Sequence, residues 1–318
     1  MRIAIAGGGG LGYLIAKALS EAPTAYSVVV LSRFARTDYA ALDIQVLIAD
    51  YNDPASLGFS LQGVNLVISV VQGAEQLTLI TAAANAGVQL FVPSEFEGKL
   101  NKRPSRNDPL DAGGYAAQAR ALLRRYAEGG GMQYTVFSCG IFMERFHPSG
   151  LAAFGMGESS GLSDPGMYLL DLTNTAAEIV ERNEKGHSVR ICMTSVYDVA
   201  QFIVAAIQLN PGTWGREWTM KGDKMSLQDL VGTCGRFFNT TFQIQYRQVA
   251  QLPPWIAHYQ QQGDYESAAQ YQRLLSTAEG RYEFNTATLN DAIRESPFVD
   301  VRPTRFREWL ESVYPPET

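Results

Sequence analysis

The sequence is poor in the residues that cross-link small proteins or bind metals. Its 318 residues include three cysteines and three histidines, all well separated along the chain. An odd number of scattered cysteines makes no disulfide framework, and neither residue type shows a metal-ligand spacing. No apolar run reaches the roughly 20 residues of a membrane-spanning helix. We therefore expect a cytoplasmic protein in a reducing compartment, with no metal and no membrane partner.

Excess positive charge is also lacking. The chain carries 26 Lys and Arg against 32 Asp and Glu, a net charge of −6, and its pI is about 5.2. This balance argues against nucleic acid or an anionic membrane surface as the main partner. A hydrophobic content of 46% and a charged content of 18% are ordinary for a globular protein. Any phosphate must therefore be held locally.

The first twelve residues, MRIAIAGGGGLG, carry the most informative motif. An alternating strand pattern at 2–6 precedes a G-x-G-x-x-G spacing, and a helix pattern at 11–19 follows it. In this context backbone N–H groups and the positive end of the helix dipole converge on one spot, which a pyrophosphate can approach closely. The residues expected to bind the dinucleotide there are Gly7, Gly9, Gly10, Leu11 and Gly12.

Strands and helices alternate through the first half of the chain. Further strands are expected at 27–32, 44–48, 64–71, 88–92 and 133–137, and helices at 74–86 and 115–128. This rhythm predicts an α/β fold, a Rossmann doubly wound parallel sheet with ligands at the carboxyl ends of its strands.

The pattern loosens after residue 138. An exposed loop rich in Gly and Ser is expected at 150–166, strands at 167–172 and 188–192, and helices at 196–209, 226–237, 251–278 and 305–314. We expect a nucleotide-binding Rossmann domain over 1–150. A smaller α/β substrate-binding region, 151–318, covers it as a cap, interleaved with it and not independent.

The end of the second strand indicates which dinucleotide binds. An NAD site usually has Asp or Glu there, whereas this strand ends with Ser32 and Arg33, with Arg36 close behind. A cation and a hydroxyl can hold a 2′-phosphate by charge-assisted hydrogen bonds. We therefore expect NADP(H), with Ser32 and Arg33 at the 2′-phosphate; an ordinary surface arginine is the alternative.

Residues 87–98, GVQLFVPSEFEG, resemble the G-V-x-x-F-x-P-S-E-F-G stretch of the NmrA-like and isoflavone-reductase-like family of atypical short-chain dehydrogenases. The glycine turn, the LITAAANAGV helix and the segment MQYTVFSCGIFMERF are similar too, and the likeness is nearest to fungal secondary-metabolism members. It implies an NADP-binding Rossmann domain followed by a small substrate domain. Further cofactor contacts are expected at Val71, Gln72, Gln76 and Ser94.

One residue typical of the family's reductases is replaced. The resemblance implies a lysine near the nicotinamide on the helix before the sixth strand, and an ungapped match puts Arg120 there. Arginine stays charged, so it cannot donate a proton, but it can clamp an anion or stabilise negative charge; a surface arginine is the alternative. The Tyr-x-x-x-Lys pair of ordinary short-chain dehydrogenases is also missing, because Tyr115 is followed by Ala119.

Other candidates for acid–base chemistry are Glu95, in the P-S-E-F turn, and Glu144, in the G-I-F-M-E segment. Apolar neighbours would raise the pKa of either carboxyl, although a structural role in the turn or in a salt bridge is the alternative for each. His147 is a third candidate. Side chains expected to hold a flat, largely uncharged substrate are Phe96, Phe142, Met143 and Tyr259.

Three functions follow from these residues. The first is NADPH-dependent reduction of a C=N, C=C or C=O bond in an aromatic or alkaloid-like small molecule of secondary metabolism. A C=N substrate is favoured, because an iminium needs little proton donation and a carboxylate would hold it. The second is a non-redox acid–base cyclase of the Pictet–Spengler type that keeps NADP as a structural element. The third is a non-catalytic NADP-sensing regulator.

Overall fold

A six-stranded parallel sheet forms the centre of the N-terminal half, and it confirms the expected Rossmann class. The computed structural model describes residues 1–315. The strand order is β3-β2-β1-β4-β5-β6, with every neighbouring pair parallel. The strands are β1 (Arg2–Ala6), β2 (Ser27–Ser32), β3 (Gln45–Ile48), β4 (Leu66–Ser69), β5 (Leu90–Val92) and β6 (Gln133–Tyr134). The order reverses between β1 and β4, where ligands bind in such sheets.

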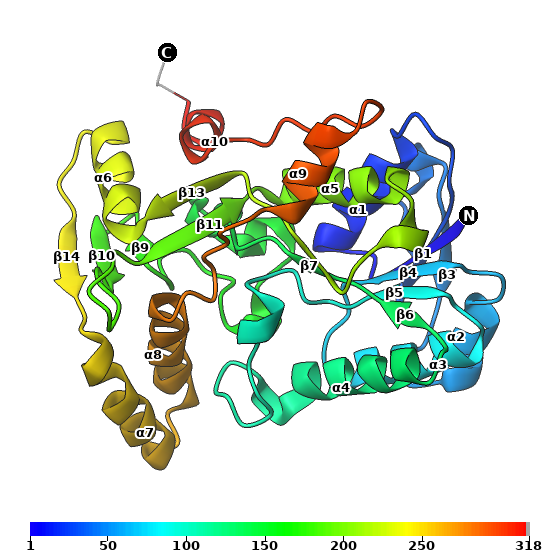
Figure 1. Cartoon of the computed structure of the whole chain (residues 1–318), viewed down its shortest axis with the longest axis horizontal. Coiled ribbons are helices and arrows are strands. Elements are labelled where there is room, and N and C mark those ends of the chain that lie inside the picture. Colours follow the sequence, from blue (N-terminus) through cyan, green and yellow to red (C-terminus); the bar gives the residue numbers. More distant parts are fainter. Residues whose placement is uncertain (316–318) are drawn as a thin grey trace.

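Helices cover both faces of this sheet (Figure 1). One face carries α1 (Gly10–Ser20), α5 (Val196–Gln208) and α9 (Thr288–Glu295), and the other α2 (Pro54–Ser60), α3 (Ala74–Asn85) and α4 (Tyr115–Glu128). The sheet strands are apolar on both sides, so each face buries its own core.

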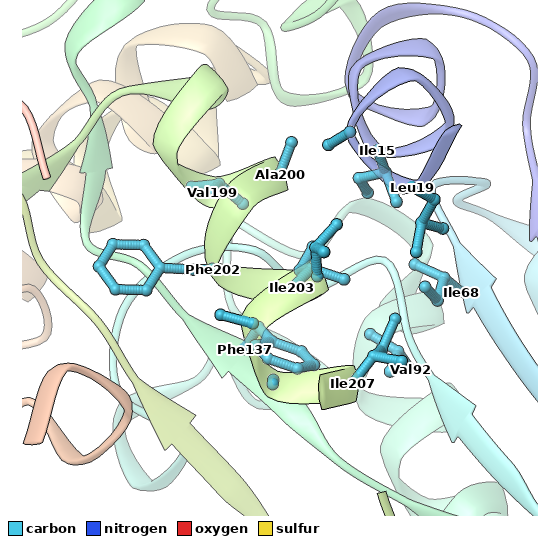
Figure 2. Packing of buried hydrophobic residues seen from close by; sticks show 14 of the residues in the cluster. Ile15, Leu19, Ile68, Val92, Phe137, Val199, Ala200, Phe202, Ile203 and Ile207 are labelled. Atoms are coloured by element: carbon cyan, nitrogen blue, oxygen red, sulfur yellow. The ribbon is translucent and has the colours of Figure 1, made fainter. Parts of the chain in front are cut away.

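Helix α5 belongs to the second half of the sequence but completes the first core. Figure 2 shows its Ile203 and Ile207 directed toward Leu19 of α1 and Val92 of β5. All of these side chains are at most 3% exposed. The chain therefore returns to the Rossmann layers after residue 195, so a boundary drawn at residue 150 does not separate two contiguous bodies.

The remainder of the second half has a core of its own. Two three-stranded sheets, ordered β14-β10-β9 and β13-β11-β8, form it with four helices. The strands are β8 (Ile141–Phe142), β9 (Leu170–Asp171), β10 (Ala176–Ile179), β11 (Arg190–Thr194), β13 (Asp223–Ser226) and β14 (Gln243–Tyr246). The helices are α6 (Leu227–Phe237), α7 (Leu252–Gln262), α8 (Tyr265–Ala278) and α10 (Phe306–Val313).

The expected strand 133–137 is corrected by the structure. It breaks at Thr135, and β7 (Val136–Ser138) leaves the large sheet to pair with β12 (Glu217–Thr219). The cause is a change of partner: Thr135 N still donates to Phe91 O of β5, but Thr135 Oγ1 donates to Gly215 O. The sixth strand is therefore only β6.

Two expected elements of the second half are also corrected. The strand at 167–172 shrinks to β9, because Leu169 has a φ of +66° and leaves the extended region. The helix at 251–278 is two helices, α7 and α8, because Gly263 ends the first at a φ of +74°. At the start of α6, Ser226 and Asp229 form a capping box.

Candidate active site

The glycine turn joins β1 to α1 in a shape that only glycine permits at two positions. Gly7 has a φ of +106°, and a Cβ there would lie 2.5 Å from Val70 Cγ2. A Cβ on Gly12 would lie 2.1 Å from the carbonyl oxygen of Gly7. The N-cap of α1 is Gly9, which has no side chain to occupy the first turn, so this turn can offer backbone N–H groups to an anion. Gly12 N already donates to Gly9 O at 3.0 Å.

A segment of the second half lies against this turn. A Cβ on Gly10 would lie 2.9 Å from Met156 Cγ and 3.0 Å from the carbonyl oxygen of Gly155. Residues 150–166, expected to be an exposed loop, therefore supply part of the wall beside the glycine turn. The composition of the loop signalled no such contact, because the contact depends on the position of α1.

Two arginines flank the turn at the end of β2. Arg33 is exposed, and Ser32 Oγ accepts a hydrogen bond from Phe34 N at 3.3 Å. Arg36 lies closer to the glycines, since a Cβ on Gly9 would be 3.6 Å from its Nη1. Asp38 fixes Arg36 through two hydrogen bonds of 3.0 and 2.7 Å, which raise the pKa of Arg36. Sequence reasoning noted Arg36 but not the carboxylate that orients it.

The other expected cofactor residues lie at the ends of β4 and β5. Val71 N donates to Ser69 Oγ, and Gln72 follows it in the turn before α3. Gln76 is buried, and its Oε1 accepts from Ser94 N at 2.7 Å. Gln76 therefore ties α3 to the turn after β5 and orders that turn.

The structure brings two catalytic candidates together as an ion pair. Arg120 Nη1 lies 3.1 Å from both carboxylate oxygens of Glu95, which is 4% exposed. Arg120 Nη2 donates to Pro104 O. Arg103 holds the turn from the other side, with Nη2 donating to Glu95 O at 2.8 Å. Glu95 and Arg120 thus hold each other in place. Arg120 is therefore not the exposed surface arginine that the sequence left as an alternative.

Glu144 is fully buried, and its pKa is raised as the sequence predicted. Its carboxylate is 0% exposed and accepts from Ser195 Oγ at 2.7 Å, Val196 N at 2.9 Å and Trp309 Nε1 at 3.2 Å. Burial raises its pKa, and the three donors oppose that rise. Glu144 thus joins the start of α5 to α10, and its catalytic role stays a prediction.

The remaining candidates are spread over several elements. Tyr115, at the start of α4, is 39% exposed. Phe96 stacks on Phe137 with ring centroids 6.5 Å apart, and Tyr259 of α7 stacks on Tyr271 at 5.6 Å. Phe142 is partly exposed, whereas Met143 is fully buried in the second core. Met143 therefore packs in the second core, and its contact with substrate stays a prediction.

His147 packs edge-on against Phe154, and burial lowers its pKa. Among residues 1–315, no group of three or more His, Cys, Asp or Glu is arranged to hold a metal. Within the same range, no helix combines the length and apolar character needed to cross a membrane.

The sheet order and glycine turn define a protein of the Rossmann class. A model of the NmrA-like family matches residues 1–270, so the chain belongs to the NmrA-like family. The resemblance seen in GVQLFVPSEFEG is thereby confirmed. A curated relative, oxidoreductase BOA1 of Botryotinia fuckeliana, is 28% identical over 251 residues, which are 74% of this chain and 75% of that protein.

Solved structures show the same fold over nearly the whole chain. Isoflavone reductase is 22% identical with a TM-score of 0.69, and the match covers 98% of each chain. Leucoanthocyanidin reductase of Vitis vinifera, solved with NADPH, is 15% identical with a TM-score of 0.70, over 98% of this chain and 99% of that one.

Proposed function

We propose that the protein is an NADPH-dependent reductase of an aromatic or alkaloid-like small molecule of secondary metabolism, acting on a C=N, C=C or C=O bond. The observation that carries the proposal is the uncapped start of α1 behind the glycine turn, at the reversal point of the sheet. Its named relatives include an oxidoreductase and a reductase structure that contains NADPH.

The residues present fit NADP(H). A side chain at Gly7 or Gly12 would collide with the protein itself, so both positions require glycine. The bare backbone that results also lets a pyrophosphate approach closely. Ser32, Arg33 and Arg36 supply a hydroxyl and two cations for the 2′-phosphate. The turns holding Val71, Gln72 and Ser94 lie at the carboxyl ends of β4 and β5, where we place the nicotinamide half. When bound, NADPH supplies a hydride.

Arg120 acts in this proposal as a fixed positive charge. Its guanidinium is held by Glu95 and by the Pro104 carbonyl, so it stabilises negative charge and does not transfer a proton. Tyr115, the exposed phenol at the start of the same helix, is the candidate proton donor.

The reductase is favoured over the cyclase by the state of the two carboxylates. Ring formation by acid–base catalysis needs a carboxyl that is free to move a proton. Glu95 is engaged by Arg120, and Glu144 is enclosed by three donors and has no solvent exposure. Hydride reduction needs neither of them as a proton carrier.

The test compares NADPH with NADP+ on three probes: an aromatic aldehyde mixed with an arylethylamine, an aromatic enone and a cyclic imine. We expect loss of the nicotinamide absorbance band together with a reduced product, only with NADPH. Equal product from NADP+ would contradict the reductase and indicate the cyclase. Tight NADP binding with no turnover of any probe would indicate the sensor. The variant Tyr115→Phe should slow aldehyde reduction while leaving NADPH binding unchanged.

A further inference from the structure

Five arginines, defined here as the arginine cluster, gather at the junction of the two cores. Each interacts electrostatically with at least one other: Arg103 with Arg120 and Arg281, and Arg273 with Arg145 and Arg281. They come from segments far apart in the sequence. Arg103 lies between β5 and α4, Arg120 in α4, Arg145 after β8, Arg273 in α8 and Arg281 in the turn after α8. The fold therefore concentrates positive charge in a protein whose net charge is −6.

Carboxylates compensate only part of this charge. Glu95 pairs with Arg120, and Glu97 pairs with Arg103 at 2.7 Å and with Arg281. Among residues 1–315, no ion pair involves Arg145 or Arg273. Two carboxylates against five guanidinium groups leave positive charge that the described chain does not neutralise.

Individual guanidinium nitrogens of the cluster are also enclosed. Within the described chain, Nε and Nη1 of both Arg145 and Arg281 are enclosed and have no hydrogen-bond acceptor. Burial lowers the pKa of Arg273 to about 10, which still leaves it charged at neutral pH. Buried guanidinium groups without acceptors are strongly unfavourable, so proteins keep them where an anion will bind. Arg145 as a whole is partly exposed, but its Nε and Nη1 are enclosed, so an anion reaches them only when the surrounding side chains move.

Aromatic surface adjoins the cluster. The guanidinium carbons of Arg145 and Arg273 each lie 5.9 Å from the ring centroid of Tyr168. Tyr168 also lines a cavity of about 510 Å³ between β9, β10, β14 and α8. Arg273 Nη2 donates to Ser160 O, in the segment whose preceding residues touch the glycine turn. Tyr168 thus joins the cluster to this cavity, whose lining includes Asp171 and Glu178 but none of the five arginines. Arg273 joins the cluster to the segment that covers the nucleotide turn.

We propose that Arg145, with Arg273 and Arg281, is an anion subsite that binds a carboxylate or phenolate group of the substrate. The unpaired nitrogens supply the donors, and the Tyr168 ring supplies a flat apolar contact. This inference rests on the proposed function, because it names the substrate class of that reductase as acidic aromatic molecules. The proposal also argues against the cationic iminium substrate that the sequence predicts. Glu95 and Glu144, the carboxylates expected to hold that cation, are already engaged by other groups of the protein.

The test uses isothermal titration of the NADPH-loaded protein with cinnamate and with cinnamamide, its neutral counterpart of the same shape. We expect cinnamate to bind at least tenfold more tightly. Arg145→Met should remove this preference. The control Arg302→Met, which deletes a cation that is 87% exposed, should leave it intact. Equal binding of the two probes to the wild type would overturn the proposal.

Two further measurements separate the possible sources of the anion. If Arg145→Met weakens NADPH binding tenfold, the cluster serves the cofactor phosphates and the proposal is wrong. If inorganic phosphate displaces cinnamate at equal concentration, the site does not select an aromatic acid and the proposal also fails. We expect neither result. Cinnamate preference without oxidation of NADPH by any probe would refute the reductase while supporting the anion subsite.

Thermal unfolding distinguishes a binding arginine from a structural one. Removing a buried charge that lacks an acceptor should raise the Tm of the ligand-free protein, whereas removing a stabilising arginine would lower it. We therefore expect Arg145→Met to unfold at a higher temperature than the wild type. Cinnamate should raise the Tm of the wild type but not of the variant. A lower Tm for the variant, with no stabilisation of the wild type by cinnamate, would contradict the proposal.

Discussion

The substitution Glu144→Gln tests whether the most enclosed carboxylate of the chain is structural or catalytic. Glu144 Oε1 accepts from Ser195 Oγ and Trp309 Nε1, and Oε2 accepts from Val196 N. A glutamine has the same shape but only one oxygen. With that oxygen at the Oε1 position, its NH₂ group faces the Val196 N–H, which is left unpaired at the first turn of α5.

The expected loss follows from these contacts. A hydrogen bond to a charged group contributes about 1.5–3 kcal/mol to stability. Replacing the buried carboxylate with a neutral amide also removes the unfavourable desolvation of the charge, which offsets part of that loss. We therefore expect Glu144→Gln to lower the free energy of unfolding by about 1–2 kcal/mol. Glu144→Ala leaves all three donors unpaired, at about 1–3 kcal/mol each, so its expected loss is about 4 kcal/mol or more.

Urea unfolding measured by tryptophan fluorescence checks these values, with the exposed Glu184→Gln as a matched control that we expect to change nothing. The turnover per folded molecule of Glu144→Gln should equal that of the wild type. A glutamine variant with unchanged stability and no turnover would refute the structural role and restore Glu144 as a catalytic residue.

The raised pKa of Glu144 adds a pH dependence of defined sign. Its pKa in the folded state lies above the unfolded value of 4.5, so the folded protein binds the proton more tightly. The resulting stability is complete below pH 4.5 and is lost as the pH rises through the folded pKa. The stability difference between wild type and Glu144→Gln should therefore shrink as the pH rises from about 4.5. A difference that grows over this range would contradict the raised pKa.

The remaining predictions concern the glycine turn, the ion pair and the 2′-phosphate. Gly12→Ala should abolish NADPH binding and lower the Tm, because its Cβ would meet a carbonyl oxygen at 2.1 Å. Gly58→Ala, in open space within α2, should instead raise the free energy of unfolding by about 0.5–1 kcal/mol. Equal Tm values for the two variants would contradict this. Glu95→Gln should lower the free energy of unfolding by about 3 kcal/mol in urea titrations, because Arg120 loses its buried partner; no change would show the pair is not stabilising. Arg33→Asp should reduce the NADPH-over-NADH affinity ratio at least tenfold in fluorescence titrations, and an unchanged ratio would refute the assignment.

Much of the Rossmann half could be predicted because its signals are local. A strand buried on both faces needs a continuous apolar run, so VVVL indicated β2 without knowledge of its neighbours. The same holds for the glycine turn, whose spacing alone places a helix start behind a strand. The β6–β7 break was not predictable, because it depends on Thr135 meeting Gly215, which is 80 residues away in the sequence.

For the candidate site too, the local features could be predicted and the long-range contacts could not. The residue types that could do chemistry were identified from motifs, Glu95 and Arg120 among them, but their pairing was not. A side chain's charge is visible in the sequence, whereas its partner depends on which turn lies opposite which helix. Arg145 illustrates the limit, because within FMERF nothing distinguishes it from a surface arginine.

The sequence by itself determined the fold class and the nucleotide turn of this NmrA-like protein. Strand periodicity and the need for bare backbone at a phosphate act over a few residues, so they leave a local pattern. Only the tertiary structure showed that Glu144 joins α5 to α10, that α5 completes the first core, and that, among residues 1–315, five clustered arginines have two carboxylates as their ion-pair partners. Burial and charge balance are sums over segments far apart in the chain, and such sums exist only once the chain has folded.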